Sequence, residues 1–317
     1  MNFDTASKQS NIDRFLQCTT PTVRSQFLPK IEIANLNRLW HPSETEKIEY
    51  FTLNDLWDCY NEWSAYGAGV PITLDDNETL VQYYVPYLSA IQIFTSNLRD
   101  EIESGDGERS SDYFSDSCST VESESDKLWR SDGCCSSEDG GSSEQDSVLH
   151  FNNRLGYLYF QYFETSTPYE RVPLMDKISG FSRRYPGLMS LRSVDLSPAS
   201  WMAVSWYPIY HIPMGRTIKD LSTCFLSYHT LSSSFQETDV EADVERVEKN
   251  RKGGEGISLP PFGLATYKMQ GNVWLSPAGC EGDQERLLSL LSVADSWLKQ
   301  LSVQHNDFDY FSGIRRG

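Results

Sequence analysis

The stretch SWMAVSWYPIYHI at residues 200–212 is rich in aromatic and aliphatic side chains, which favour a strand. The stretch STCFLSYHTL at residues 222–231 has the same character and predicts a second strand. Residues 80–95, LVQYYVPYLSAIQIFT, are similar, but Pro86 interrupts them, so we expect two short strands or one broken edge strand. These segments predict the sheet around which the remaining elements fold.

Helical patterns lie on both sides of these strands. Ser10 is placed to cap a short helix that ends at residues 19–21, and Thr52 is placed to cap another. Residues 173–184 predict a helix with a proline in its first turn. Asp283 is placed to cap the last helix, which carries one apolar stripe: Leu287, Leu290, Leu291, Ala294, Trp297, Leu298 and Leu301.

Three further segments have weaker patterns. Residues 19–50 predict an irregular arm held by four apolar anchors: Phe27, Leu28, Leu39 and Trp40. Residues 155–163 fit one face of a helix, although the same letters would also fit a strand. Residues 262–268 and 272–275 predict a hairpin.

The order of these elements indicates the fold class. Helices, strands, helices, strands and a final helix follow one another without regular alternation of strand and helix. This order predicts an α+β fold in which a largely antiparallel sheet is flanked by helices.

The charge of the chain is concentrated in one segment. The 317 residues carry 45 acidic and 27 basic side chains, a net charge of −18, and residues 100–146 hold 15 of the acids and 3 of the bases, a net of −12. That segment also holds 13 serines and few apolar residues, so we expect a disordered acidic insertion. Residues 1–99 and 147–317 would then form one split domain, with 236–256 as a charged flexible loop within it.

Several classes of protein are disfavoured by these numbers. No run of 18 apolar residues predicts a membrane span, and the first fifteen residues lack the pattern of a secretory signal. Seven cysteines without a secretory signal indicate reduced thiols in the cytoplasm or the nucleus. The acidic balance argues against nucleic acid as a partner.

The common catalytic motifs are absent from the sequence. It contains no nucleophile elbow, zinc-binding helix, phosphate loop or dinucleotide fingerprint, so no cofactor and no metal are predicted. His211 and His229 lie in the two predicted strands and would approach each other if those strands pair. The alternative is that each imidazole is hydrogen-bonded in the core.

One region is the best candidate for an unfamiliar active site. Arg192 and Asp195 flank a predicted turn before a strand, where polar functional groups are common. We expect such a site to be a cleft lined by these two residues together with Ser197, Trp201, His211 and His229. The alternative is that Asp195 and Ser197 only cap the turn.

The acidic insertion suggests a regulatory mechanism. Four serines have an acidic residue three positions later, which is the pattern that acid-directed kinases favour: Ser119, Ser123, Ser136 and Ser143. Phosphorylation would make the insertion an electrostatic switch or a docking tail. The alternative is a passive solubilising insert, and composition does not separate the two.

Several long stretches together resemble a plant family known as domain of unknown function 789. They are SNIDRFLQCTTPTV, YFTLNDLWDCYNEWSAYGAGVPI, YYVPYLSAIQIF, YFETSTPYERVPLMDKI, LRSVDLSPASWMAVSWYPIYHIPMG and DLSTCFLSYHTLSS. Val194 and His211 depart from the family pattern, where Cys and Arg are common, and the second departure weakens any anion clamp there. The resemblance implies a plant intracellular protein and assigns no catalytic or binding residue.

These observations predict a non-enzymatic interaction or regulatory protein with a phosphorylatable acidic insertion. Its partners would be proteins of unknown identity. The alternative is an enzyme with an unrecognised site near residues 192–211.

Overall fold

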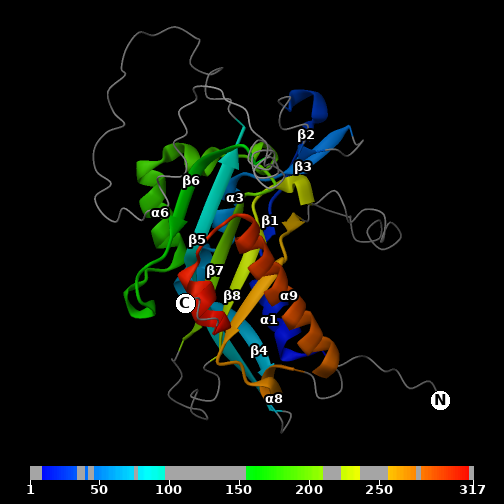
Figure 1. Cartoon of the computed structure of the whole chain (residues 1–317), viewed down its shortest axis with the longest axis vertical. Coiled ribbons are helices and arrows are strands. Elements are labelled where there is room, and N and C mark those ends of the chain that lie inside the picture. The colour runs from blue at the N-terminus through cyan, green and yellow to red at the C-terminus, as the bar shows by residue number, and fades with distance from the viewer. Residues whose placement is uncertain are drawn as a thin grey trace, which may run out of the picture. The chain divides into compact units, whose positions relative to one another are not determined.

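A six-stranded sheet forms the centre of the part of the chain that the structure describes (Figure 1). The computed structural model describes residues 9–33, 40–41, 46–74, 78–96, 155–209, 223–235, 256–275 and 280–313, all of which belong to one compact unit. The strands of this sheet are β4 (Ala68–Thr73), β5 (Thr79–Thr95), β6 (Tyr157–Phe163), β7 (Trp201–Pro208), β8 (Cys224–Thr230) and β10 (Gly263–Tyr267). They are ordered β10–β8–β7–β5–β4, β6 also pairs with β5, and every pairing is antiparallel. The predicted α+β class with an antiparallel sheet is confirmed.

The strand β5 is central and continuous, so the expected break or edge position at Pro86 is wrong. One side of β5 pairs with β7, while its other side pairs with β4 over residues 79–84 and with β6 over residues 90–95. Pro86 lies in the interval between those two partners. A missing N–H costs little where the hydrogen-bond ladder is already interrupted, so the sheet tolerates this proline.

Residues 157–163 form a strand and not a helix. The first residue of β6, Tyr157, pairs with Thr95, the last residue of β5. The segments before and after residues 97–154 therefore contribute neighbouring strands to one sheet. The predicted insertion at 100–146 lies outside the described residues.

One face of the sheet carries the larger part of the core. Five helices pack there: α1 (Asn11–Thr19), α3 (Leu53–Asp58), α4 (Asn61–Tyr66), α6 (Leu174–Arg184) and α8 (Gly271–Trp274). Figure 1 shows α1 and α3 behind the strands. The Phe225 ring stacks on Phe15 with centroids 3.8 Å apart and meets the edge of Trp274 at 4.8 Å. These aromatic contacts fix α1 and α8 against β8.

The opposite face is covered by the last two helices, α9 (Cys280–Gln300) and α10 (Asn306–Ser312), which cross in front of the strands in Figure 1. Successive residues of β8 alternate between the faces, so Phe225 joins the first core while Leu226 and Tyr228 join the second. The apolar stripe predicted on the last helix contributes Ala294 and Leu298, which are buried. The helix begins at Cys280, so Asp283 lies inside it and is not its cap.

Two helix caps act as the sequence predicts, and a glycine ends a third helix. The Ser10 hydroxyl accepts a hydrogen bond from the Asp13 N–H at 3.3 Å. Thr52 and Asp55 form a reciprocal capping box at the start of α3. Gly67 ends α4 with a φ of 82°, a conformation that favours glycine.

The arm at residues 19–50 contains more regular structure than expected. It holds β1 (Thr22–Val23), β2 (Gln26–Pro29) and β3 (Lys47–Tyr50); β2 pairs with β3, and β1 pairs with β9 (Ile257–Ser258). Leu28 and Trp40 are buried as predicted, but Phe27 is 65% exposed and is not an anchor. Leu39 lies outside the described residues. Short 3-10 segments complete the described chain: η1 (Lys30–Glu32), η4 (Pro168–Glu170), η5 (Pro186–Ser190), η6 (Ser193–Asp195) and η8 (Ser233–Phe235).

The hairpin predicted over residues 262–275 is wrong in its second half. Strand β10 is followed by the helical turn α8 and not by a second strand. Trp274 is fully buried against Phe225, and this packing overrides the strand preference of residues 272–275. Of the predicted loop 236–256, only Gly256 is among the described residues.

Candidate functional site

Arg192 and Asp195 form a half-exposed ion pair at η6. Arg192 Nε lies 2.6 Å from Asp195 Oδ2, and Nη2 lies 3.1 Å from Oδ1. The guanidinium also lies over the Tyr50 ring, 5.8 Å from its centroid. Its hydrogen bond to Asp195 raises the pKa of Arg192, so this pair is a charged and mutually neutralised unit.

His229 lies in the core as a neutral imidazole. Its Nδ1 is 3.0 Å from the Leu259 carbonyl oxygen and its Nε2 is 2.9 Å from Ser227 Oγ. Since a carbonyl can only accept, Nδ1 carries the proton and Nε2 accepts from the serine. Burial lowers the pKa of His229 to about 4, so both ring nitrogens serve the fold.

The other candidates of the 192–229 region also have structural partners. Ser197 Oγ accepts a hydrogen bond from the Ala199 N–H at 3.3 Å, which caps the turn. Trp201 is fully buried and donates from Nε1 to Gln92 Oε1 at 3.0 Å. His211 lies outside the described residues, so its approach to His229 stays a prediction.

The densest group of polar side chains lies elsewhere, under α10. Arg171 binds Asp307 at two points, with 2.7 Å both from Nη1 to Oδ2 and from Nη2 to Oδ1. Ser89 Oγ donates to Asp307 Oδ2 and lies 2.9 Å from His305 Nε2. His305 Nδ1 is 2.8 Å from the Tyr228 hydroxyl. We call these five residues the buried polar cluster.

The hydrogen bonds of the buried polar cluster run in one direction. Because Ser89 donates its proton to Asp307, His305 must donate to Ser89 from Nε2. The Tyr228 hydroxyl then donates to His305 Nδ1. Burial lowers the pKa of His305 to about 4, partly opposed by the nearby Asp307 carboxylate, which agrees with a neutral ring. Each hydrogen bond is therefore donated in the same direction, from Tyr228 through His305 and Ser89 to the Asp307 carboxylate. Arg171 neutralises the charge of that carboxylate.

This direction is not that of a nucleophilic triad. An activated serine donates to an imidazole whose other nitrogen is held by a carboxylate. Here Ser89 donates to the carboxylate itself, and the second nitrogen of His305 accepts from a phenol. The cluster therefore holds the start of α10 against β5 and β8. Its polar groups form their hydrogen bonds with other groups of the protein.

A second ion pair joins the half-buried Lys177 to the buried Glu164. Lys177 Nζ lies 3.2 Å from Glu164 Oε2, and Glu164 Oε1 accepts from the N–H groups of Thr165 and Ser166. Burial raises the pKa of Glu164, but hydrogen bonds from Tyr162, Ser166 and Lys177 outweigh it and lower the pKa to about 2. Glu164 is therefore ionised at neutral pH.

Sequence patterns gave no sign of the buried polar cluster. Ser89 and Asp307 are separated by 218 positions, and Arg171 and Asp307 by 136. Ser89 is the extra residue where the register of β5 against β7 shifts between Leu88 and Ala90. Only the folded register brings these side chains together.

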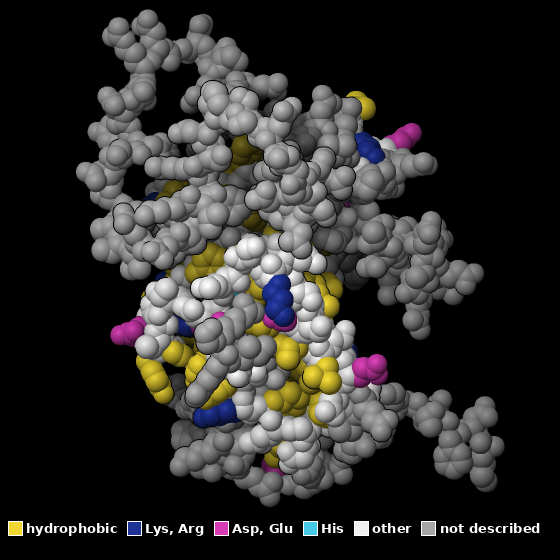
Figure 2. Space-filling model, viewed as in Figure 1, with side chains coloured by type: hydrophobic (Ala, Val, Ile, Leu, Met, Phe, Trp, Pro, Cys, Tyr) yellow, Lys and Arg dark blue, Asp and Glu magenta, His cyan; other side chains and the backbone are white. Residues whose placement is uncertain are grey.

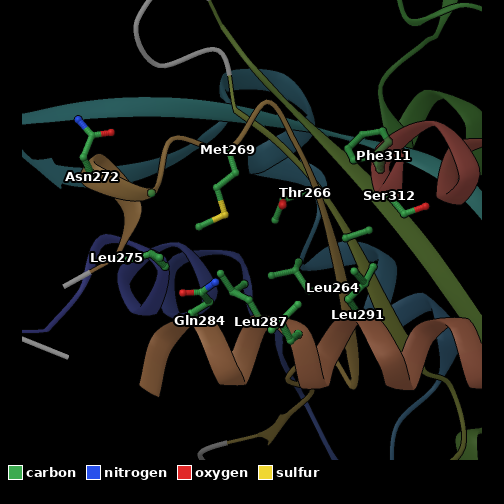
Figure 3. A pocket seen from close by; sticks show the side chains of 13 residues that line it. Leu264, Thr266, Met269, Asn272, Leu275, Gln284, Leu287, Leu291, Phe311 and Ser312 are labelled. Atoms are coloured by element: carbon green, nitrogen blue, oxygen red, sulfur yellow. The ribbon is translucent and has the colours of Figure 1, made fainter. Parts of the chain in front are cut away.

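A hollow of 620 Å³ lies where the edge strand β10 meets α8, α9 and α10 (Figure 3). Figure 3 shows Leu264, Leu287 and Leu291 between the strand and α9, with Met269 above them. In the space-filling view, hydrophobic side chains gather over this lower region of the described surface (Figure 2). None of Arg192, Asp195 and His229 lines the hollow.

The part of the chain that the structure describes contains no group of three His, Cys, Asp or Glu side chains able to hold a metal ion. Its helices also lack the length and apolar character needed to cross a bilayer.

The comparisons with known proteins give a family and no activity. Neither a curated protein nor a solved structure matches the chain. A family model described as "Protein of unknown function (DUF789)" matches residues 10–311, which includes every strand of the sheet and both polar groups under α6 and α10. The chain therefore belongs to the DUF789 family.

Proposed function

We propose that this chain is a non-enzymatic interaction or regulatory protein of the plant cytoplasm or nucleus. Its folded part would contact a protein partner, and residues 100–146 would adjust that contact through their charge. The buried polar cluster carries this proposal. His305, Ser89 and Asp307 are the groups best suited to acid–base or nucleophilic work, and each is engaged in holding α10. Because these groups stabilise the fold through their hydrogen bonds to one another, a binding role is favoured over a catalytic one.

The start of β6 is the contact surface that we favour. Tyr157 and Leu158 are exposed there, and among the described residues β6 has a strand partner only in β5. A strand edge with exposed apolar side chains is a common site of protein association. Such a surface would bind through backbone hydrogen bonds and apolar contact.

Phosphorylation of the acidic segment would supply the regulation. Each phosphate on Ser119, Ser123, Ser136 or Ser143 would add about −1.5 to −2 charges near neutral pH. Ten residues, 147–156, separate this segment from the start of β6, so the modified residues lie close in the sequence to the exposed side chains. The added charge would favour basic partners and disfavour acidic ones.

The proposal is tested by quantitative affinity purification with the unmodified chain and five variants of it. Leu158→Ser, placed at the proposed surface, should reduce recovery of the main partner, while Tyr169→Ser, at a fully exposed side chain elsewhere, should leave it unchanged. Replacing Ser119, Ser123, Ser136 and Ser143 together by Ala or by Asp should shift recovery in opposite directions. A partner set that is unchanged when residues 100–146 are deleted would remove the segment from this account.

A further inference from the structure

We propose that the hollow between β10 and α9 binds a neutral, mostly apolar small molecule. This site is separate from the contact surface at β6, and the proposal does not depend on the interaction role. Its volume of 620 Å³ falls within the range of ligand pockets in proteins.

The shape of the hollow follows from one close approach between strand and helix. A Cβ atom added to Gly263 would lie 2.8 Å from the Ala294 Cβ, so β10 and α9 touch there. Beyond Leu264 the strand rises away from α9 toward Met269, as Figure 3 shows. The space between them is a wedge that the fold itself creates.

Aliphatic side chains make up much of the lining of the wedge. Leu264 and Ala265 of β10 form part of the lining and are almost completely buried. Leu287 and Leu291 line it from α9, and Leu288, on the same helix, is 59% exposed. An apolar group placed here would exchange water contact for aliphatic contact.

The described lining carries no charged side chain. Its polar side chains are the neutral groups of Thr266, Asn272, Gln284 and Ser312. A charged ligand would lose hydration without meeting an opposite charge, which is costly, whereas a hydroxyl or amide could be hydrogen-bonded. The described lining therefore favours an uncharged ligand.

Two other occupants fit less well. An added peptide strand would need the outer edge of β10, but α9 packs against this strand, with Gly263 in close contact with Ala294. A second copy of the chain would bring together two molecules that each carry a net charge of −18. A small neutral molecule meets neither obstacle.

The test compares three probes with the same carbon chain and different head groups: 1-octanol, octanoate and octylammonium. Binding to the full chain is measured by calorimetric titration at neutral pH. We expect saturable binding of one octanol, with octanoate and octylammonium about tenfold weaker or worse. Equal affinity for the three probes, or no saturable binding of octanol, would overturn the proposal.

A matched pair of variants locates the site. Leu288→Glu places a charge in the lining and should weaken octanol binding about tenfold. Val293→Glu makes the same change at a 43% exposed position of the same helix outside the lining, and should leave the affinity unchanged. Equal effects of the two variants would overturn the assignment, as would a dimer in light scattering that Leu288→Glu dissociates. Circular dichroism of both variants checks that α9 is intact.

Discussion

The guanidinium of Arg171 and the carboxylate of Asp307 meet in a two-point ion pair with side chains only 4% and 9% exposed. The Asp307 carboxylate also accepts from Ser89, so its oxygens are held on two sides. Desolvating two charges is costly, and the pair offsets that cost only while both partners are present.

Removing one member of this pair should therefore be severe. We expect Arg171→Met to lower the free energy of unfolding by about 3–5 kcal/mol, because it leaves the Asp307 carboxylate buried without its counter-charge. Urea denaturation followed by circular dichroism measures the change. Arg192→Met, which breaks the half-exposed pair with Asp195, is the control and should cost about 1 kcal/mol or less. Equal losses of stability in the two variants would show that burial of the Arg171–Asp307 pair does not make its disruption more costly.

Stability should fall as the pH drops from neutral toward 4. The pKa values of His229 and His305 are lowered from 6.5 to about 4 by burial, so the unfolded chain binds more protons within that interval. Their contribution is complete above pH 6.5 and is lost as the pH approaches 4, with a limiting slope of about 1.4 kcal/mol per pH unit for each histidine.

Urea midpoints measured between pH 4 and pH 7 check this dependence. His229→Gln should reduce the slope in that interval, because it removes one of the two titrating groups. A separate loss should follow below pH 4.5, where Glu164, whose pKa is lowered to about 2, gains a proton more readily in the unfolded chain. A profile that is flat between pH 6.5 and pH 5 would contradict the neutral state of both histidines.

The contact between Gly263 and Ala294 should tolerate no added methyl group. Gly263→Ala places a Cβ 2.8 Å from the Ala294 Cβ, so α9 must shift, and we expect a loss of about 1–3 kcal/mol in stability. Thermal unfolding with calorimetry gives the value. Gly180→Ala in α6 is the matched control, since no atom lies within 4 Å of its added Cβ and alanine favours a helix by about 1 kcal/mol. The two substitutions should have opposite signs.

Loss of the capping box at α3 should have a moderate effect. Thr52→Ala removes the acceptor for the Asp55 N–H, at 3.2 Å, and should cost about 1 kcal/mol. Thr52→Ser keeps the hydroxyl and should retain most of the stability. Chemical denaturation of the two variants side by side makes the comparison, and a serine variant as unstable as the alanine variant would rule out the cap as the cause.

Local chemistry explains which elements could be predicted from the sequence. The caps at Ser10 and Thr52 depend on residues three positions apart, so they are visible without knowledge of the fold. Strands β7 and β8 are recognisable because their composition matches buried strands. In contrast, Pro86 misled the prediction for β5, because its cost depends on where β4 and β6 end along the neighbouring edge.

The buried polar cluster and the hollow depend on packing between distant segments. Arg171, Ser89 and Asp307 have unremarkable sequence neighbours, and their contacts exist only after β5, β8 and α10 come together. Among the expected site residues, Arg192 and Asp195 do meet, but as partners of each other. The wedge beside α9 needs the crossing at Gly263, which no periodicity in the sequence reveals.

The pairing of Thr95 with Tyr157 makes the covalent link between the two strands dispensable in principle. Sixteen of the 17 residues of β5 are paired with β4, β6 or β7 in the sheet. The entropic cost of closing a flexible loop rises by only about 0.6 kcal/mol for each doubling of the loop length. Fragments ending before and starting after residues 97–154 should thus be able to reassemble by complementation. The same junction offers a place to graft a foreign domain or a reporter between β5 and β6.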